Sequence, residues 1–310
     1  MSTSVRYPVL APLIASAIWG GMYVVSKWVF ASMPPLALAF CRVVLGSIVL
    51  LAVVRATKPE RAFSRRDWLG FAGLAVVLAV SLATQFLGTD LTSAGQGSLV
   101  TVLSPVFTLA LGVAVLDESL GPRKLAGAAL ALVGTGLVLA GRYDPTALAV
   151  DTLLGPGMLV LAAATWAAYT AFGKPLIRKY SALEAATYTT VLSIPLFGLF
   201  ALAEFWWVDA SAASVTVTPG LVAAVLYLGV VSTALAWYLW YKGMEQVDAG
   251  TVAVTFFAQP VVGVGLGALL LDEPIGPLFL VGGVVMAAGV YLVSTARVDS
   301  PESSGPAGAD

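Results

Sequence analysis

The chain contains no histidine and only one cysteine, Cys41, among its 310 residues. Without histidine it can form neither a Ser-His-Asp triad, nor an HExxH zinc site, nor a histidine proton relay. A single cysteine excludes an intramolecular disulfide and any cysteine-based metal cluster. The residues thus offer no catalytic constellation and no metal or cofactor site, so we expect a protein that is not an enzyme and uses no cofactor.

Charged residues are also scarce. They make up 11% of the chain, whereas hydrophobic residues make up 59%. A soluble domain carries about 25% charged residues, so most of the surface of this protein must face lipid. The formal net charge of -1 provides no basic field that would attract nucleic acid. We expect a protein embedded in a lipid bilayer with no nucleic-acid partner.

Ten apolar runs are long enough to cross a bilayer, since a spanning helix needs about 20 mostly apolar residues. The first follows Arg6, as in a signal peptide, but it continues to Phe30 and is too long for an h-region. The sequence predicts an all-α polytopic membrane protein with ten transmembrane helices and a disordered, cytoplasmic tail at 297–310. The runs cover residues 8–30, 34–55, 67–87, 94–116, 121–141, 153–174, 183–205, 219–241, 248–271 and 276–296.

The basic residues predict the orientation. If the N-terminus is cytoplasmic and ten helices alternate, nearly all Lys and Arg fall on the cytoplasmic side, and the other side receives only Arg142 and Lys27. Lys27 is expected to snorkel to the interface, with a gate role as the alternative. The positive-inside bias predicts a multi-pass protein of the plasma (inner) membrane with both termini in the cytoplasm.

One stretch occurs twice. Residues 105–138 and 260–293 align with a shift of 155 positions (260 − 105), which matches their prolines, acidic turns and several glycines, including Gly127 with Gly282 and Gly134 with Gly289. We infer a first five-helix repeat at 1–141, a linker at 142–152 and a second repeat at 153–296. Because five is odd, the second repeat is inverted in the membrane. Inverted repeats are typical of secondary transporters, which bind substrate near the midplane between the halves.

The inverted topology separates the two acidic turns. Asp117-Glu118 and Asp272-Glu273 fall on opposite sides of the membrane and cannot form one carboxylate site. Each pair is expected to close a helical hairpin and to stabilise the N-terminus of the helix that follows it, where the helix dipole favours negative charge.

The order of these motifs resembles a known family. Leu91-Thr92-Ser93-Ala94 leads to Ser104-Pro105 and the first acidic turn, and Val247-Asp248-Ala249 leads to Gln259-Pro260 and the second. Ala39-Phe40-Cys41-Arg42 resembles the arginine-bearing second helix of the EamA-type ten-helix transporters of the drug/metabolite transporter superfamily. The resemblance covers roughly residues 9–296. It implies an inverted-repeat bundle around a central cavity and a small metabolite as substrate, often an amino acid or a drug-like cation, usually exported.

Aromatic residues at the middle of two spans are candidates for lining that cavity. Trp19 and Trp166 correspond in the two repeats, with a shift of 147 positions (166 − 19). Tyr23 and Tyr169 follow them by about one helical turn and therefore share their faces. Packing in the protein core is the alternative and the commoner use of aromatic residues.

Arg42 lies about two turns into the second span. A charge at this depth is expensive unless it is paired, faces water or snorkels. It could contact an anionic group of a substrate, such as a carboxylate. It could instead be structural, bound to carbonyl groups at a helix end.

Two prolines interrupt the fourth and ninth spans near the midplane: Pro105, preceded by Ser104, and Pro260, preceded by Gln259. A proline inside a helix removes one backbone hydrogen bond and frees a carbonyl group. Neighbouring polar side chains or a substrate can satisfy that carbonyl. A kink that only shapes the bundle is the alternative.

Three further residues complete the candidate substrate-binding set. Gln85 and Gln96 are polar, although both are expected near the external ends of their helices. Trp237 belongs to an aromatic cluster near a span end, for which a belt at the lipid headgroups is the favoured interpretation and an inward-facing Trp237 the lesser one. The predicted site lies between spans 1, 3 and 4 and spans 6, 8 and 9.

No Asp or Glu is expected at the centre of a span, so the sequence leaves proton coupling open. We predict a secondary transporter that exports small organic metabolites, such as amino acids or drug-like compounds, by alternating access. A facilitative permease that works in the import direction and a structural membrane protein without transport activity are the alternatives. The expected partners are a small-molecule substrate and the lipid bilayer. Whether protons take part, and whether the protein is a monomer or a homodimer, stay open.

Overall fold

The computed structural model describes residues 7–116, 121–141, 150–208, 215–244 and 255–295, and every regular element in these ranges is a helix. Eight helical segments are long and apolar enough to span a bilayer, and two shorter apolar helices bring the set to ten. The predicted all-α polytopic fold is therefore confirmed. The predicted tail at 297–310 and linker residues 142–149 lie outside the described ranges.

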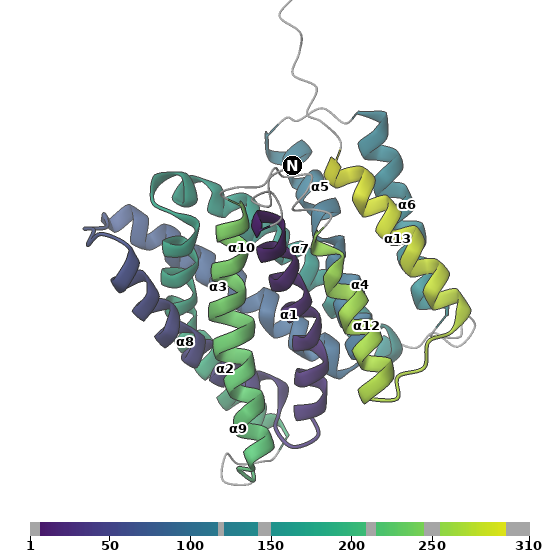
Figure 1. Ribbon diagram of the computed structural model, residues 1–310, viewed down its shortest axis with the longest axis horizontal. Helices are drawn as coiled ribbons and strands as arrows, with labels where there is room; N and C mark the ends of the chain where they lie inside the picture. The colour runs from purple at the N-terminus through teal and green to yellow at the C-terminus, as the bar shows by residue number, and fades with distance from the viewer. Residues whose placement is uncertain (1–6, 117–120, 142–149, 209–214, 245–254, 296–310) are drawn as a thin grey trace, which may run out of the picture.

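The helices follow the predicted spans closely (Figure 1). The first five spans are α1 (Tyr7–Val29), α2 (Pro35–Thr57), α3 (Arg65–Asp90), a broken helix of α4 (Ala94–Val100), the 3-10 turn η2 (Thr101–Leu103) and α5 (Ser104–Leu116), and α6 (Pro122–Ala140). The other five are α7 (Val150–Lys179), α8 (Ala182–Trp207), a rod of α9 (Pro219–Leu226), the π-helical η4 (Tyr227–Leu235) and α10 (Ala236–Met244), then α12 (Ala258–Leu270) and α13 (Pro277–Thr295).

Helix pairings in one half of the chain are repeated in the other. Helix α3 packs against α7 as α1 packs against α10, and α5 packs against α7 as α12 packs against α1. Two further pairs, α6 with α13 and α2 with α8, join spans that occupy the same position in each half. This pattern is the one expected for two five-helix units related by a two-fold axis. Figure 1 shows α6 and α13 side by side at one edge and α1 in the middle of the bundle.

The distribution of polarity is that of a protein in lipid. Large apolar side chains point outward, such as Leu202 and Val261, which are 69% and 71% exposed. Polar side chains are instead buried, among them Arg42, Gln96 and Gln259. Because hydrocarbon offers no hydrogen bonds, polar groups in the spans have to find partners inside the bundle.

The glycines of the duplicated motif lie where α6 crosses α13. A Cβ atom on Gly134 would lie 2.2 Å from the backbone nitrogen of Met286, and one on Gly282 would lie 2.8 Å from the carbonyl oxygen of Gly134. Gly127 and Gly289 form a second close contact: a Cβ atom on Gly127 would lie 2.8 Å from the carbonyl oxygen of Gly289, and one on Gly289 would lie 2.6 Å from that of Gly127. The glycines therefore let the two backbones touch, as small residues do in membrane helix pairs.

The second acidic turn joins the two halves. The Glu273 carboxylate accepts hydrogen bonds from the backbone N–H groups of Ala94, at 2.6 Å, and Gly95, at 2.9 Å. A side chain at Gly267 would collide with this carboxylate, at 2.7 Å from its Oε2. The sequence predicts that Glu273 stabilises the helix after it, α13; it caps α4 in the other repeat instead. The equivalent Asp117-Glu118 turn lies outside the described residues.

Two more contacts connect helices at this end of the bundle, where α1 and α3 finish and α2 and α4 begin. The Glu204 carboxylate of α8 accepts hydrogen bonds from the N–H groups of Leu36 and Ala37 at the start of α2. Lys27 donates to the carbonyl oxygen of Asp90, the last residue of α3. Lys27 thus does not snorkel but neutralises a helix C-terminus, where the dipole favours a cation.

Replacing Gly134 by alanine should destabilise the protein by about 1–3 kcal/mol, because the new methyl group meets backbone atoms that cannot rotate away. Thermal unfolding of the purified protein in detergent measures this. Gly136 is the matched control in the same helix, since a Cβ there meets no atom within 4 Å. Gly136→Ala should be neutral or slightly stabilising, because alanine favours helix. Equal effects of the two variants would contradict the proposed crossing.

Glu273→Gln should lower the melting temperature by a few degrees, because a charged acceptor of two backbone N–H groups is replaced by a neutral one. The neighbouring Asp272→Asn variant is the control. It removes the same charge, and Asn tolerates the positive φ of 53° found at Asp272 as readily as Asp does. If both variants have the same melting temperature, the change in net charge rather than the lost cap of α4 explains the lower stability.

Candidate functional site

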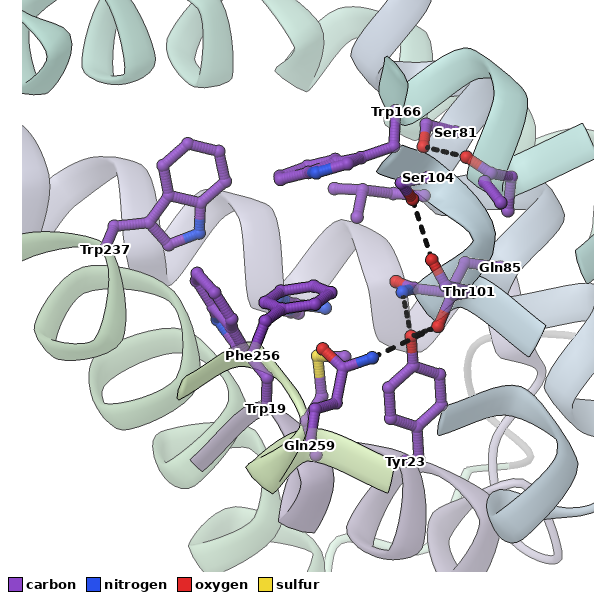
Figure 2. Close-up of a pocket in the computed structure, with 15 residues that line it drawn as sticks. Trp19, Tyr23, Ser81, Gln85, Thr101, Ser104, Trp166, Trp237, Phe256 and Gln259 are labelled. Carbon is purple, nitrogen blue, oxygen red and sulfur yellow. Dashed lines mark hydrogen bonds between the residues drawn. The ribbon is translucent and has the colours of Figure 1, made fainter. Parts of the chain in front are cut away.

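A cavity lies at the centre of the bundle, between the two halves (Figure 2). Its volume is about 50 Å³, which accommodates a few water molecules. A solute as large as an amino acid needs more room, so the helices must separate for one to enter. The lining residues are Trp19, Met22, Tyr23, Arg42, Ser81, Leu82, Gln85, Thr101, Ser104, Ala162, Ala163, Trp166, Trp237, Phe256 and Gln259.

Most of the predicted site residues meet at this cavity. Those that line it are Trp19, Tyr23, Arg42, Gln85, Ser104, Trp166, Trp237 and Gln259. Gln85 therefore lies deeper than the expected external helix end. Tyr169 and Gln96 do not line it. The Tyr169 ring packs behind the wall, 5.4 Å from the ring of Trp166, and Gln96 is fully buried in α4.

Aromatic rings form one side of the cavity. In Figure 2, Trp237 faces Trp166, and their ring centroids are 5.6 Å apart. Trp19 packs edge-on against Phe256 at 6.2 Å. Trp237 is only 6% exposed, whereas Trp206, near the end of α8, is 81% exposed. Trp206 thus fits an aromatic belt at the lipid headgroups. Trp237 instead points into the bundle and lines the cavity.

The helix break before Pro105 opens the polar side of the cavity. Pro105 has no N–H group to donate to the carbonyl oxygen of Thr101, four residues earlier. The Ser104 hydroxyl donates to that oxygen at 2.7 Å in its place. The second predicted proline, Pro260, is buried in the first turn of α12, next to Gln259. Neither proline lines the cavity itself; each sets the position of a neighbour that does.

Four polar groups form a chain along this side. The Tyr23 hydroxyl lies 2.7 Å from the Thr101 hydroxyl and accepts a hydrogen bond from Nε2 of Gln85. Nε2 of Gln259 donates to the Thr101 hydroxyl, at 3.2 Å, and to the carbonyl oxygen of Ser98, at 3.1 Å. The chain links spans 1, 3, 4 and 9, so both halves contribute to it.

Arg42 is buried in the wall, with 4% of its surface exposed. Its Nε donates to the hydroxyl of Thr233 at 2.9 Å, and its guanidinium group lies 5.6 Å from the ring centroid of Phe86. Among the described residues it forms no ion pair. It therefore neither snorkels nor binds a helix end, and no described carboxylate pairs with its charge.

The π-helical segment η4 positions both Arg42 and Trp19. In its wider turn, the Thr233 hydroxyl donates to the carbonyl oxygen of Leu228, five residues earlier. The hydroxyl oxygen of Thr233 is then free to accept from Nε of Arg42. The preceding residue, Ser232, offers its carbonyl oxygen to the indole Nε1 of Trp19 at 3.0 Å. Short π-helical segments are frequent at functional sites.

Sequence reasoning missed seven residues that line the cavity, and helical spacing could have found them. Each of the seven lies three or four residues from an identified site residue and therefore on the same helix face. Met22 is three residues after Trp19, Ser81 four before Gln85 and Phe256 three before Gln259. The complete set is Met22, Ser81, Leu82, Thr101, Ala162, Ala163 and Phe256.

Known proteins resemble this chain over nearly its whole length. It is 30% identical over 278 residues to an "Uncharacterized transporter" of Archaeoglobus fulgidus, covering 89% of this chain and 93% of the relative. It is also 30% identical over 287 residues to a "Probable amino-acid metabolite efflux pump" of Escherichia coli, covering 90% and 92%. One solved structure has the same fold, with a TM-score of 0.66, 19% identity and coverage of 93% and 98%.

The EamA-like transporter family matches the chain twice, at residues 6–140 and 153–295. The two matches include all the spans that line the cavity. The chain belongs to the EamA-like transporter family.

Proposed function

We propose that this protein exports small organic metabolites, amino acids among them, by alternating access. It does so in the plasma (inner) membrane with both termini in the cytoplasm. The cavity carries the proposal, because it lies inside the bundle, combines aromatic and polar walls, and draws its lining from both halves. This is the position that inverted-repeat transporters use for substrate. The printed name of the Escherichia coli relative, an efflux pump for amino-acid metabolites, supports the direction and the substrate class.

Alternating access requires each end of the bundle to open in turn. At the end where α2 and α4 begin, opening must separate Glu273 from the N-terminus of α4 and Glu204 from that of α2. These contacts join opposite halves, so a relative movement of the halves breaks them together.

A purely structural membrane protein is a weaker candidate. Burying an unpaired polar group or charge costs several kcal/mol, and the cavity wall contains Arg42 without an ion-pair partner among the described residues. A scaffold gains nothing from such a wall. A transporter does, since a substrate can provide the missing partners.

Facilitated diffusion is the second candidate mechanism, and one observation favours it. No Asp or Glu appears among the described residues that line the cavity. Coupling through the substrate site needs a group that exchanges protons in the working pH range, and Tyr23 and Arg42 titrate too high in their usual ranges to do so.

Trp19→Ala and Trp166→Ala should each lower the rate of substrate counterflow about tenfold, because the loss of about 1.4 kcal/mol of aromatic contact is enough for that change. The assay uses the purified protein in liposomes and a labelled panel of amino acids and related metabolites. Trp206→Ala is the matched control, since this side chain is 81% exposed on the outside of α8. Normal flux in both cavity variants would show that the cavity is not the transport path.

An imposed pH gradient should leave the final accumulation of substrate unchanged, since no described residue of the cavity wall is a carboxylate that could carry a proton. The same liposomes measure this, with an ionophore that collapses the gradient as the control. Accumulation that scales with the gradient would reject facilitated diffusion and would require the carboxylates at the helix ends to couple transport.

A further inference from the structure

Two of the side chains that line the cavity keep a buried polar atom without a partner among the described residues: Nη1 of Arg42 and Oε1 of Gln85. The hydroxyl groups of the wall have partners; the Ser81 hydroxyl, for example, donates to the carbonyl oxygen of Ala162 at 3.0 Å. Buried polar atoms are normally paired, and an exception calls for an explanation. The wall thus has two unused N–H donors on Nη1 of Arg42 and an unused acceptor, Oε1 of Gln85.

The hydrogen-bond chain determines which atom of the Gln85 amide is free. The Thr101 hydroxyl donates its only proton to the carbonyl oxygen of Gly97 at 2.8 Å. Tyr23 must therefore donate to Thr101 in their 2.7 Å contact, which leaves the Tyr23 oxygen as an acceptor. Gln85 has to present Nε2 to Tyr23, so the unpaired atom is the acceptor Oε1.

The two unpaired atoms belong to side chains that line the same cavity of about 50 Å³. The guanidinium group of Arg42 also lies 5.6 Å from the ring centroid of Phe86, the residue next to Gln85 on α3. The opposite wall is apolar, with Trp166, Trp237 and Phe256.

We propose that Arg42 and Gln85 recognise the two charged groups of a zwitterionic α-amino acid with an apolar side chain. The carboxylate binds Nη1 of Arg42, the ammonium group donates to Oε1 of Gln85, and the apolar side chain packs among the aromatic rings. A simple amine is repelled by Arg42, and a simple carboxylate leaves Oε1 unpaired. Only the zwitterion satisfies both atoms. This proposal rests on the proposed transport function and specifies its substrate.

Three ligands of matched size test it: L-leucine, 4-methylpentanoate, which lacks the amino group, and 3-methylbutylamine, which lacks the carboxylate. Their affinities for the purified protein are measured from its tryptophan fluorescence, so no transport is needed. Leucine should bind about tenfold or more tightly than either analogue, since hydrogen bonds to charged groups are strong and an unpaired buried partner is costly.

Two variants test which residue binds the carboxylate and which binds the ammonium group. Arg42→Met should abolish the preference for leucine over 3-methylbutylamine and leave its preference over 4-methylpentanoate. Gln85→Leu should do the reverse. The comparison of ligands within one variant is its own control, because a general distortion of the cavity weakens all three ligands alike. Arg42→Lys, which keeps the charge, should retain part of the carboxylate preference.

The outcomes separate this inference from the transport proposal. Uniform weakening of all three ligands by Arg42→Met, or wild-type protein that binds 3-methylbutylamine as tightly as leucine, would refute the recognition pair. Folded wild-type protein that binds none of the three would refute it too. If leucine binds with the expected pattern but does not exchange across liposomes, the recognition pair stands and the transport function fails.

Discussion

The rest of this structure depends on one constraint: hydrocarbon supplies no hydrogen bonds. Hydroxyl groups along the spans accordingly donate to carbonyl oxygens three to five residues earlier, as Ser104 and Thr233 do. Where Pro105 removes a backbone donor, the serine beside it replaces the bond. Among the described residues of the cavity wall, Nη1 of Arg42 and Oε1 of Gln85 are buried without a partner. The cavity is therefore one place where the protein leaves hydrogen-bonding capacity unused.

The duplicated motif builds the scaffold rather than the site. Its glycines let α6 and α13 touch, and Gly267 leaves the space through which Glu273 reaches α4. Both contacts join one half of the chain to the other. They fix where the halves meet, and the cavity lies on that junction several turns deeper. An acidic pair that resembles a catalytic dyad in the sequence is a helix cap.

Sequence reasoning found the spans and most of the wall, because composition determines which helices face lipid and because duplication singles out Trp19 and Trp166. It failed where the rotation or depth of a helix determines whether a side chain reaches the cavity. Gln96 and Tyr169 lie on the expected helices but behind the wall. The π-helical turn of η4 was also not foreseen, since the stretch 227–235 contains no proline and its widening is visible only in the fold.

That turn connects substrate recognition to helix position. Ser232 holds Trp19 of α1, and the adjacent Thr233 holds Arg42 of α2, so a single segment of span 8 sets two elements of the wall. A ligand shifts a conformational equilibrium only if it binds the two states with different affinity. Movement of span 8 against α1 and α2 changes both contacts, and with them the direction in which Arg42 presents its free nitrogen. If substrate binds Arg42 as proposed, it favours the conformation that keeps η4 in place, and its release removes that preference.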